Sequence, residues 1–187
     1  MMRRSIPASI AGAVLVTLAV AGCSDESGKS GKAAASFDAC ALLTAEDFNA
    51  VFDRTFTADE AGKTTGGGGA KQGAMMSCAW VSPGAEVAGK PMASLNNTYF
   101  INLIAWSWPA GSSGSDNYMN SFVEAAKTYN QPVPVPVTLG DGALWGGKTM
   151  HVKKGDVTMS LTFTGPDDEA AKRAAAESLA TTALGRL

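Results

Sequence analysis

The sequence predicts an α+β domain in which a mostly antiparallel sheet of about five strands packs with three helices. Three segments carry apolar residues at helical spacing, and two segments on either side of Lys154-Gly155 alternate apolar and polar residues. The predicted order is helix, two strands, helix, three strands and helix. Because the strands come in groups rather than alternating one by one with helices, we expect an antiparallel sheet covered by helices.

The first segment, residues 1–22, has the pattern of a lipoprotein export signal. It begins with paired arginines, continues with an apolar run from Ile10 to Val20, and places small residues directly before Cys23. The apolar run is shorter than the roughly 20 residues that a membrane-spanning helix requires. We therefore expect cleavage before Cys23, a lipid on that cysteine, and a location on the extracytoplasmic face of the cell membrane.

Residues 23–36 are predicted to form a flexible tether, and residues 37–187 a single globular domain. The tether is small, polar and without periodicity, which is typical of linkers. Loss of the signal removes two arginines from a chain with 15 basic and 17 acidic residues, so the net charge changes from −2 to −4. No basic cluster offsets this acidity, and nucleic acid is therefore excluded as a partner.

Two cysteines, Cys40 and Cys78, remain once Cys23 carries a lipid. In the oxidising environment outside the cytoplasm, two such thiols are expected to form a disulfide bond. The alternative is a reactive thiol that works with His151, the single histidine of the chain.

The first helix is predicted to begin after Thr44, because Asp47 follows at the spacing of a capping box. Its apolar face is formed by Phe48, Val51 and Phe52. From Thr55 to Gly73 the chain loses its pattern and passes through four consecutive glycines at 66–69. Because glycine runs oppose regular structure, this segment is expected to be a mobile loop.

The middle of the chain predicts two strands and a second helix. Ala74–Val81 and Tyr99–Trp108 read as strands, and the second is expected to be central because both of its faces are apolar. Ser115 is expected to cap a helix whose apolar positions are Tyr118, Met119, Phe122, Ala126 and Tyr129. The following connector, with alternating prolines at 132–136, is expected to lie at an edge of the sheet or outside it.

The C-terminal part predicts a hairpin and a last helix. Lys148–Val152 and Val157–Phe163 alternate around the turn, and their polar face is expected to face solvent or line a shallow groove. That face carries Thr149, His151, Lys153, Thr158, Ser160 and Thr162. Pro166 and the acids at 167–169 suit a helix start, and the expected buried stripe is Ala171, Ala175, Leu179, Ala183 and Leu187.

Two motifs imitate ligand sites. Gly142–Thr149 matches the letters of a phosphate-binding loop, but a strand rather than a helix is predicted to follow it, so we interpret its glycines as turn formers. The acids at 167–169 point in different directions at a helix start and serve the helix dipole. We expect no metal site and no cofactor.

Five residues are singled out as candidates for ligand binding: Trp106, Trp108, Trp145, His151 and Ser160. The tryptophans lie in or near strands, where they form either ordinary core or an apolar pocket for a lipid tail. A catalytic site would have to combine His151 with a hydroxyl on the same strand face, namely Thr158, Ser160 or Thr162. With one histidine in the chain, a zinc site of several histidines is excluded.

The order of Cys23, Asp38–Thr44, Cys78–Trp80 and Leu139–Trp145 resembles the small lipoproteins that are common in actinobacteria. The order of elements is also similar to the PsbP-like α/β sandwich. This resemblance implies a fold and a membrane location, and it carries no activity with it.

Three functions remain open at the level of sequence. The first is a non-enzymatic binding or accessory module of the cell envelope, held at the membrane by the lipid on Cys23 and recognising another envelope protein. The second is a carrier for a lipid or another apolar ligand. The third, ranked last, is a hydrolase that uses His151.

Overall fold

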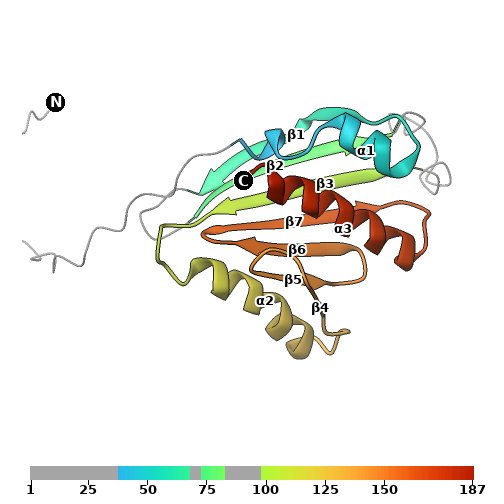
Figure 1. Cartoon of the computed structure of the whole chain (residues 1–187). Helices are drawn as coiled ribbons and strands as arrows, with labels where there is room; N and C mark the ends of the chain where they lie inside the picture. Colours follow the sequence, from blue (N-terminus) through green and yellow to red (C-terminus); the bar gives the residue numbers. More distant parts are fainter. Residues whose placement is uncertain (1–37, 68–72, 83–97) are drawn as a thin grey trace, which may run out of the picture. The chain divides into compact units, whose positions relative to one another are not determined.

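The computed structural model describes residues 38–67, 73–82 and 98–187, so the signal segment, Cys23 and the tether lie outside the described residues. The elements, shown in Figure 1, are the 3-10 helix η1 (Ala39–Ala41), α1 (Ala45–Phe52), β1 (Thr57–Gly67), β2 (Ala74–Val81), β3 (Phe100–Ser107), α2 (Gly114–Thr128), β4 (Val135–Val137), β5 (Gly142–Trp145), β6 (Thr149–Lys154), β7 (Val157–Thr164) and α3 (Glu169–Gly185). The predicted α+β class is confirmed.

All strands belong to one antiparallel sheet in the order β1-β2-β3-β7-β6-β5-β4. The expected count of about five strands was wrong, because the described residues form seven. β1 was missed because its mostly exposed residues show no apolar alternation. Within the segment that was expected to be a loop, Thr55–Gly73, residues Thr57–Gly67 form this strand instead. β4 lies in the proline-containing connector, and its position at the edge of the sheet confirms the expectation for that connector.

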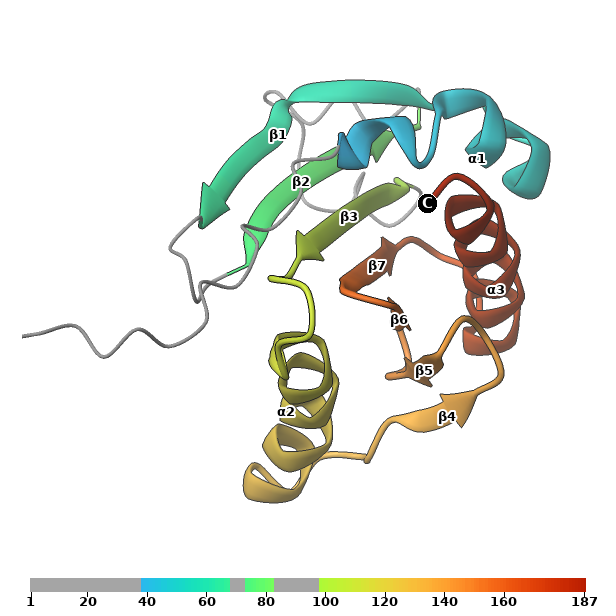
Figure 2. The ribbon, with the colours of Figure 1, turned by 60° about the vertical axis from the view of Figure 1, so that its left-hand side comes forward.

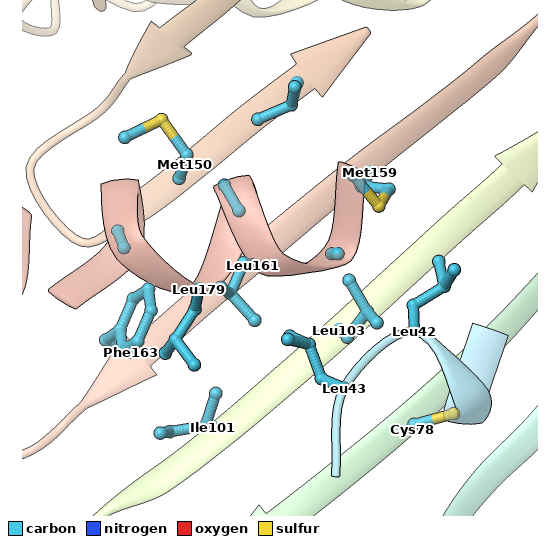
Figure 3. Close-up of a cluster of buried hydrophobic side chains, with 14 of the residues drawn as sticks. Leu42, Leu43, Cys78, Ile101, Leu103, Met150, Met159, Leu161, Phe163 and Leu179 are labelled. Carbon is cyan, nitrogen blue, oxygen red and sulfur yellow. The ribbon is translucent and has the colours of Figure 1, made fainter. Parts of the chain in front are cut away.

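The helices cover opposite faces of the sheet. α1 and α3 lie side by side on one face, and α2 packs against β6 and β7 on the other (Figure 2). The main hydrophobic core lies under α3, where Leu179 meets the strand residues Leu161 and Phe163 (Figure 3). Because side chains alternate along a strand, the residues directly before and after Leu161 in the sequence of β7 point towards the other face of the sheet, which carries α2.

Helix starts agree with the predicted signals in two of three cases. Thr44 and Asp47 form the capping box of α1, and Asp168 caps α3 by accepting from the Ala171 N–H at 2.8 Å. The predicted cap of α2 was wrong, because Ser113 holds the N-cap position and Ser115 is buried in the first turn.

The buried stripe of α3 differs from the prediction at both ends. Ala171 and Leu187 are exposed, while Ala176 and Ala180 are buried together with Ala175, Leu179 and Ala183. A strict four-residue repeat drifts around a helix that has 3.6 residues per turn, so it leaves the core after a few turns. The observed stripe follows the helical period instead.

The C-terminal end of α3 is fastened at two points. Lys154 Nζ donates to the Leu184 carbonyl at 2.8 Å. Arg186 donates to both carboxylate oxygens of Asp47, at 2.6 and 2.8 Å, and to the Leu42 carbonyl at 2.9 Å. This bidentate pair joins the chain's last residues to the start of α1, and the Arg186 guanidinium lowers the pKa of Asp47.

Candidate functional site

His151 and Ser160 face each other on neighbouring strands beneath α2. They are a cross-strand pair of β6 and β7, and His151 Nδ1 lies 2.7 Å from Ser160 Oγ. Tyr118 on α2 brings its hydroxyl to 2.9 Å from the same Ser160 oxygen. The result is a buried chain of three polar groups that links the helix to the sheet.

The protonation states of this chain follow from burial. Burial lowers the pKa of His151 to about 4, so the imidazole is neutral at pH 7. Burial also raises the pKa of Tyr118, which stays protonated. Two arrangements of the hydrogens fit these distances: either Tyr118 donates to Ser160 and Ser160 donates to Nδ1 of His151, or Nδ1 of His151 donates to Ser160 and Ser160 donates to Tyr118. In both cases the hydroxyl hydrogen of Ser160 is used in a hydrogen bond within this group of three side chains, and only 5% of the residue is exposed.

The polar hairpin face was expected to face solvent or line a shallow groove, and this prediction was wrong for its central residues. His151, Thr158 and Ser160 are buried because α2 lies over them. Phe122 of α2 stacks on the His151 ring, with a centroid distance of 3.5 Å and an interplanar angle of 22°. At the margin of this face Lys153 pairs with Asp116 of α2, and Thr149 and Thr162 hydrogen-bond to each other.

The candidate tryptophans divide between the two faces of the sheet. Trp106 and Trp108 stack at 5.5 Å on the α2 face, and Trp108 Nε1 donates to Thr158 at 2.9 Å. Trp145 points to the opposite face, where it is buried and its Nε1 donates to Glu169 at 3.1 Å. The structure therefore brings Trp106, Trp108, His151 and Ser160 to one face and does not bring Trp145 to them.

The predicted disulfide is present in the structure. Cys40 of η1 and Cys78 of β2 are bonded, with their Cα atoms 5.5 Å apart. Neither cysteine is left as a thiol, so the alternative of a reactive thiol working with His151 was wrong.

The segment that matches a phosphate-binding loop forms a β-turn region. Gly146, Gly147 and Lys148 connect β5 to β6, and Thr149 begins a strand instead of a helix. Without a helix N-terminus the backbone N–H groups do not converge on one anion. The interpretation of the glycines as turn formers is confirmed for Gly146 and Gly147, whereas Gly142 begins strand β5.

Among the pockets on the described part of the domain are three whose lining does not include Trp106. One of about 280 Å³ lies beside the disulfide, between the start of α1 and β1. A groove of about 550 Å³ runs between α1 and α3. A third pocket of about 230 Å³ lies between α2 and β5.

The α1–α3 groove carries opposite charges at one end. The Arg54 guanidinium carbon lies 4.5 Å from the centroid of the Tyr99 ring. Burial, followed by a hydrogen bond to Asp167, raises the pKa of Tyr99 to about 12, while the Arg54 charge opposes this rise. Small residues of α3 form the other wall, namely Ala171, Ala174, Ala175 and Ser178.

Sequence reasoning did not find this groove. Arg54 follows α1, Tyr99 precedes β3, and Asp167 precedes α3, so no local motif joins them. Asp167 was read as a helix-start residue. The pairing of β3 with β7, in which Phe100 lies opposite Thr164, brings it to Tyr99, and α1 adds Arg54 from its C-terminal end.

The described residues contain neither a metal-binding cluster nor a membrane-spanning helix. No group of three or more histidine, cysteine, aspartate and glutamate side chains in this part of the chain is placed to hold a metal ion. Within the same residues, no helix combines the length and apolar character needed to span a membrane.

No protein-family model, curated protein or solved structure matches this chain.

Proposed function

We propose that this chain is a lipid-anchored module on the extracytoplasmic face of the membrane, where it binds another envelope component without catalysing a reaction. The export pattern before Cys23 supports the anchor. The disulfide supports export, because such bonds persist in oxidising compartments and are rare in the cytosol.

The position of the disulfide is the observation that carries the proposal. Cys40 lies 17 residues after Cys23 and belongs to the first described element, η1. Its bond to Cys78 attaches this element covalently to β2, an interior strand of the sheet. A force applied at the lipidated end would therefore be transmitted to the sheet through a covalent bond, and it would not have to be resisted by the short helix η1 alone.

The anchor is tested by Cys23→Ala in the host, with a labelled fatty acid and separation of membrane and soluble fractions. We expect the wild-type protein to carry the label and to sediment with membranes. The variant should lose the label and leave the membrane fraction. A labelled Cys23→Ala protein, or an unlabelled wild-type protein, would contradict the anchor.

The α1–α3 groove is the binding surface that we propose for the partner. Its volume of about 550 Å³ is within the range of ligand sites. Arg54 and Asp167 offer one charge of each sign near its end, and the alanines of α3 let a partner approach the helix closely. We expect it to hold a polar partner segment that carries both an acidic and a basic group.

A photo-crosslinking residue at position 178 tests the groove, with the same residue at position 124 as the control. Ser178 lines the groove, whereas Glu124 lies exposed on α2 at the opposite face. We expect a discrete crosslinked product from position 178 only, and its loss on Arg54→Glu. Equal products from both positions, or no product from position 178, would argue against the groove.

A carrier of a small apolar ligand is a second candidate, favoured by the pocket beside the disulfide. Leu43, Cys78 and Trp80 give this pocket an apolar floor, and Ala58 lies at its wall. Native mass spectrometry of the mature protein from its host should then show a bound adduct that Ala58→Phe removes. An adduct that survives Ala58→Phe, or a clean apo mass for the wild type, would reject the carrier.

A further inference from the structure

Exposed apolar side chains follow one another along the chain from the end of α2 to the edge strand β4. Among the described residues five large hydrophobic side chains are exposed, and three of them lie within seven residues of each other. These are Tyr129, Val133 and Val135, with exposed fractions of 73%, 49% and 50%. We name these three residues the β4 patch.

The β4 patch lies in a stretch without charge. From Thr128 to Gly140 the chain has no acidic or basic residue, and the prolines at 132 and 136 are exposed as well. The turn between β5 and β6 lies beside it, because Gly146 approaches Pro134. Exposed clusters of this kind mark surfaces that contact proteins or membranes.

Strand addition does not explain the patch. Pro136 pairs with Leu144 on β5 in the register of β4. Because proline lacks an N–H, an edge strand accommodates it with its nitrogen facing away from the neighbouring strand. The outward edge of the three-residue strand β4 therefore lacks the central donor that an added strand would need. The side chains, rather than the backbone, are what this edge offers.

We propose that the β4 patch rests on the surface of the membrane that holds the lipid of Cys23, an inference that depends on the proposed anchor. Tyrosine places an apolar ring and a polar hydroxyl at the boundary between acyl chains and water. Valine and proline side chains add apolar contact at the same edge. A flat lipid surface suits such a patch, because in the described part of the chain no strand pairs with the outer edge of β4.

The predicted tether is long enough for this contact. Asp38, the first described residue, lies fifteen residues after Cys23. A chain of this length spans at most about 50 Å, and a flexible linker of this length spans about 21 Å on average. η1 packs on β2 and β3. From β2 to β4 the sheet order includes five strand spacings, or about 24 Å along the sheet.

The anchor also explains how three side chains could suffice. A patch of this size binds lipid weakly when the protein is free in solution. Once the lipid on Cys23 is inserted, contact becomes intramolecular, with an effective concentration on the order of millimolar for short flexible linkers. The patch would then set the orientation of the domain, and the α1–α3 groove would keep a fixed direction relative to the bilayer.

An environment-sensitive fluorophore at position 133 tests the contact. In the mature chain with Cys23→Ser, the disulfide uses both other cysteines, so Val133→Cys provides the one reactive thiol. Vesicles of phosphatidylethanolamine and phosphatidylglycerol at about millimolar lipid, which replaces the effective concentration that the anchor supplies, should raise and blue-shift the emission. The same fluorophore at Thr181→Cys, on the exposed side of α3, is the control and should not change. Unchanged emission at position 133, or equal changes at both positions, would overturn the inference.

A partition measurement tests the patch without a label. The triple variant Tyr129→Ser, Val133→Ser, Val135→Ser in the Cys23→Ser chain should lower binding to the same vesicles by tenfold or more. Leu187→Ser is the matched control, because Leu187 is 43% exposed and outside the patch. Far-UV circular dichroism checks that the variants are folded. Equal binding by the triple variant and the control would reject the patch.

The vesicle measurements can contradict the patch without contradicting the anchor, because the two proposals are tested by different experiments. Vesicle binding by the Cys23→Ser chain depends on the patch alone, whereas membrane sedimentation in the host reports the lipid. Absence of vesicle binding with intact lipidation would overturn the patch and leave the proposed anchor standing. Binding to vesicles without lipidation would retain the patch as a lipid-contacting surface and reject the anchor.

Discussion

His151 shows how packing decides the role of a single residue. Alternation around the hairpin turn places His151 and Ser160 on the same face, and their cross-strand pairing confirms this. The sequence could not show that α2 covers this face, because its docking depends on Tyr118 and Phe122, which lie more than twenty residues earlier in the chain. The pair therefore serves as an internal link of the domain.

The buried imidazole should make stability depend on pH. Its pKa is lowered to about 4 in the folded domain, against 6.5 for a free histidine. Below pH 6.5 the unfolded chain binds a proton that the folded domain does not, so the free energy of unfolding falls as the pH falls. Between pH 7 and pH 5 we expect a loss of about 2 kcal/mol. Urea unfolding measures it, and His151→Asn should remove most of the dependence; an unchanged dependence in this variant would contradict the assignment.

Ser160 should be the most sensitive member of the polar chain. Ser160→Ala leaves Tyr118 and His151 without their partner, and we expect a loss of about 2–4 kcal/mol. Tyr118→Phe should cost about 1 kcal/mol. The double variant should be at most a few tenths of a kcal/mol less stable than Ser160→Ala, because both changes remove the same hydrogen bond. Additive losses in urea unfolding would show that the two hydroxyls act independently.

At the scale of elements, the strands and helices with apolar periodicity could be predicted, and so could the edge position of the connector that holds β4, whereas the edge strand β1 could not. β6 and β7 are predicted because one face lies in the core, and α1 because its cap is local in sequence. β1 is polar and carries an irregularity between Asp59 and Thr64, where its pairing register with β2 shifts. An edge strand needs one partner and little burial, so its sequence carries a weak signal.

The start of α2 depends on a close contact that requires glycine. An added Cβ at Gly114 would overlap with the Trp108 ring, whereas an added Cβ at Gly185 meets nothing within 4 Å. We expect Gly114→Ala to destabilise the domain by about 1–3 kcal/mol because the ring or the helix must move. Gly185→Ala should stay within about 0.5 kcal/mol of the wild type. Thermal unfolding compares the two, and equal melting temperatures would show that the contact at Trp108 is not tight.

For the whole molecule, long-range connections join the two ends of the described chain. The disulfide connects η1 to β2, and Arg186 connects the C-terminal end to Asp47 and Leu42. The disulfide could be predicted from the cysteine count and the expected compartment. The α1–α3 groove could not, because Arg54, Tyr99 and Asp167 lie far apart in sequence and meet only through the pairing of β3 with β7 and the packing of α1 beside α3.

Removal of the disulfide should lower stability without changing the fold. Its loop has a sequence separation of 38, for which loop-closure entropy predicts a contribution of about 4 kcal/mol. The double variant Cys40→Ser, Cys78→Ser should lose stability of that order, and reduction of the wild-type protein should give the same loss. Equal stability of oxidised and reduced protein in urea unfolding would show that the bond does not constrain the unfolded chain.

Intact-mass spectrometry of the protein purified from the membranes of its host is the most direct test of the proposed anchor. We predict a chain that begins at Cys23 and carries a diacylglyceryl group on that residue, with the mass of the Cys40–Cys78 disulfide retained. A chain of unmodified mass that begins at Met1, or one cleaved elsewhere without lipid, would contradict a lipid-anchored module.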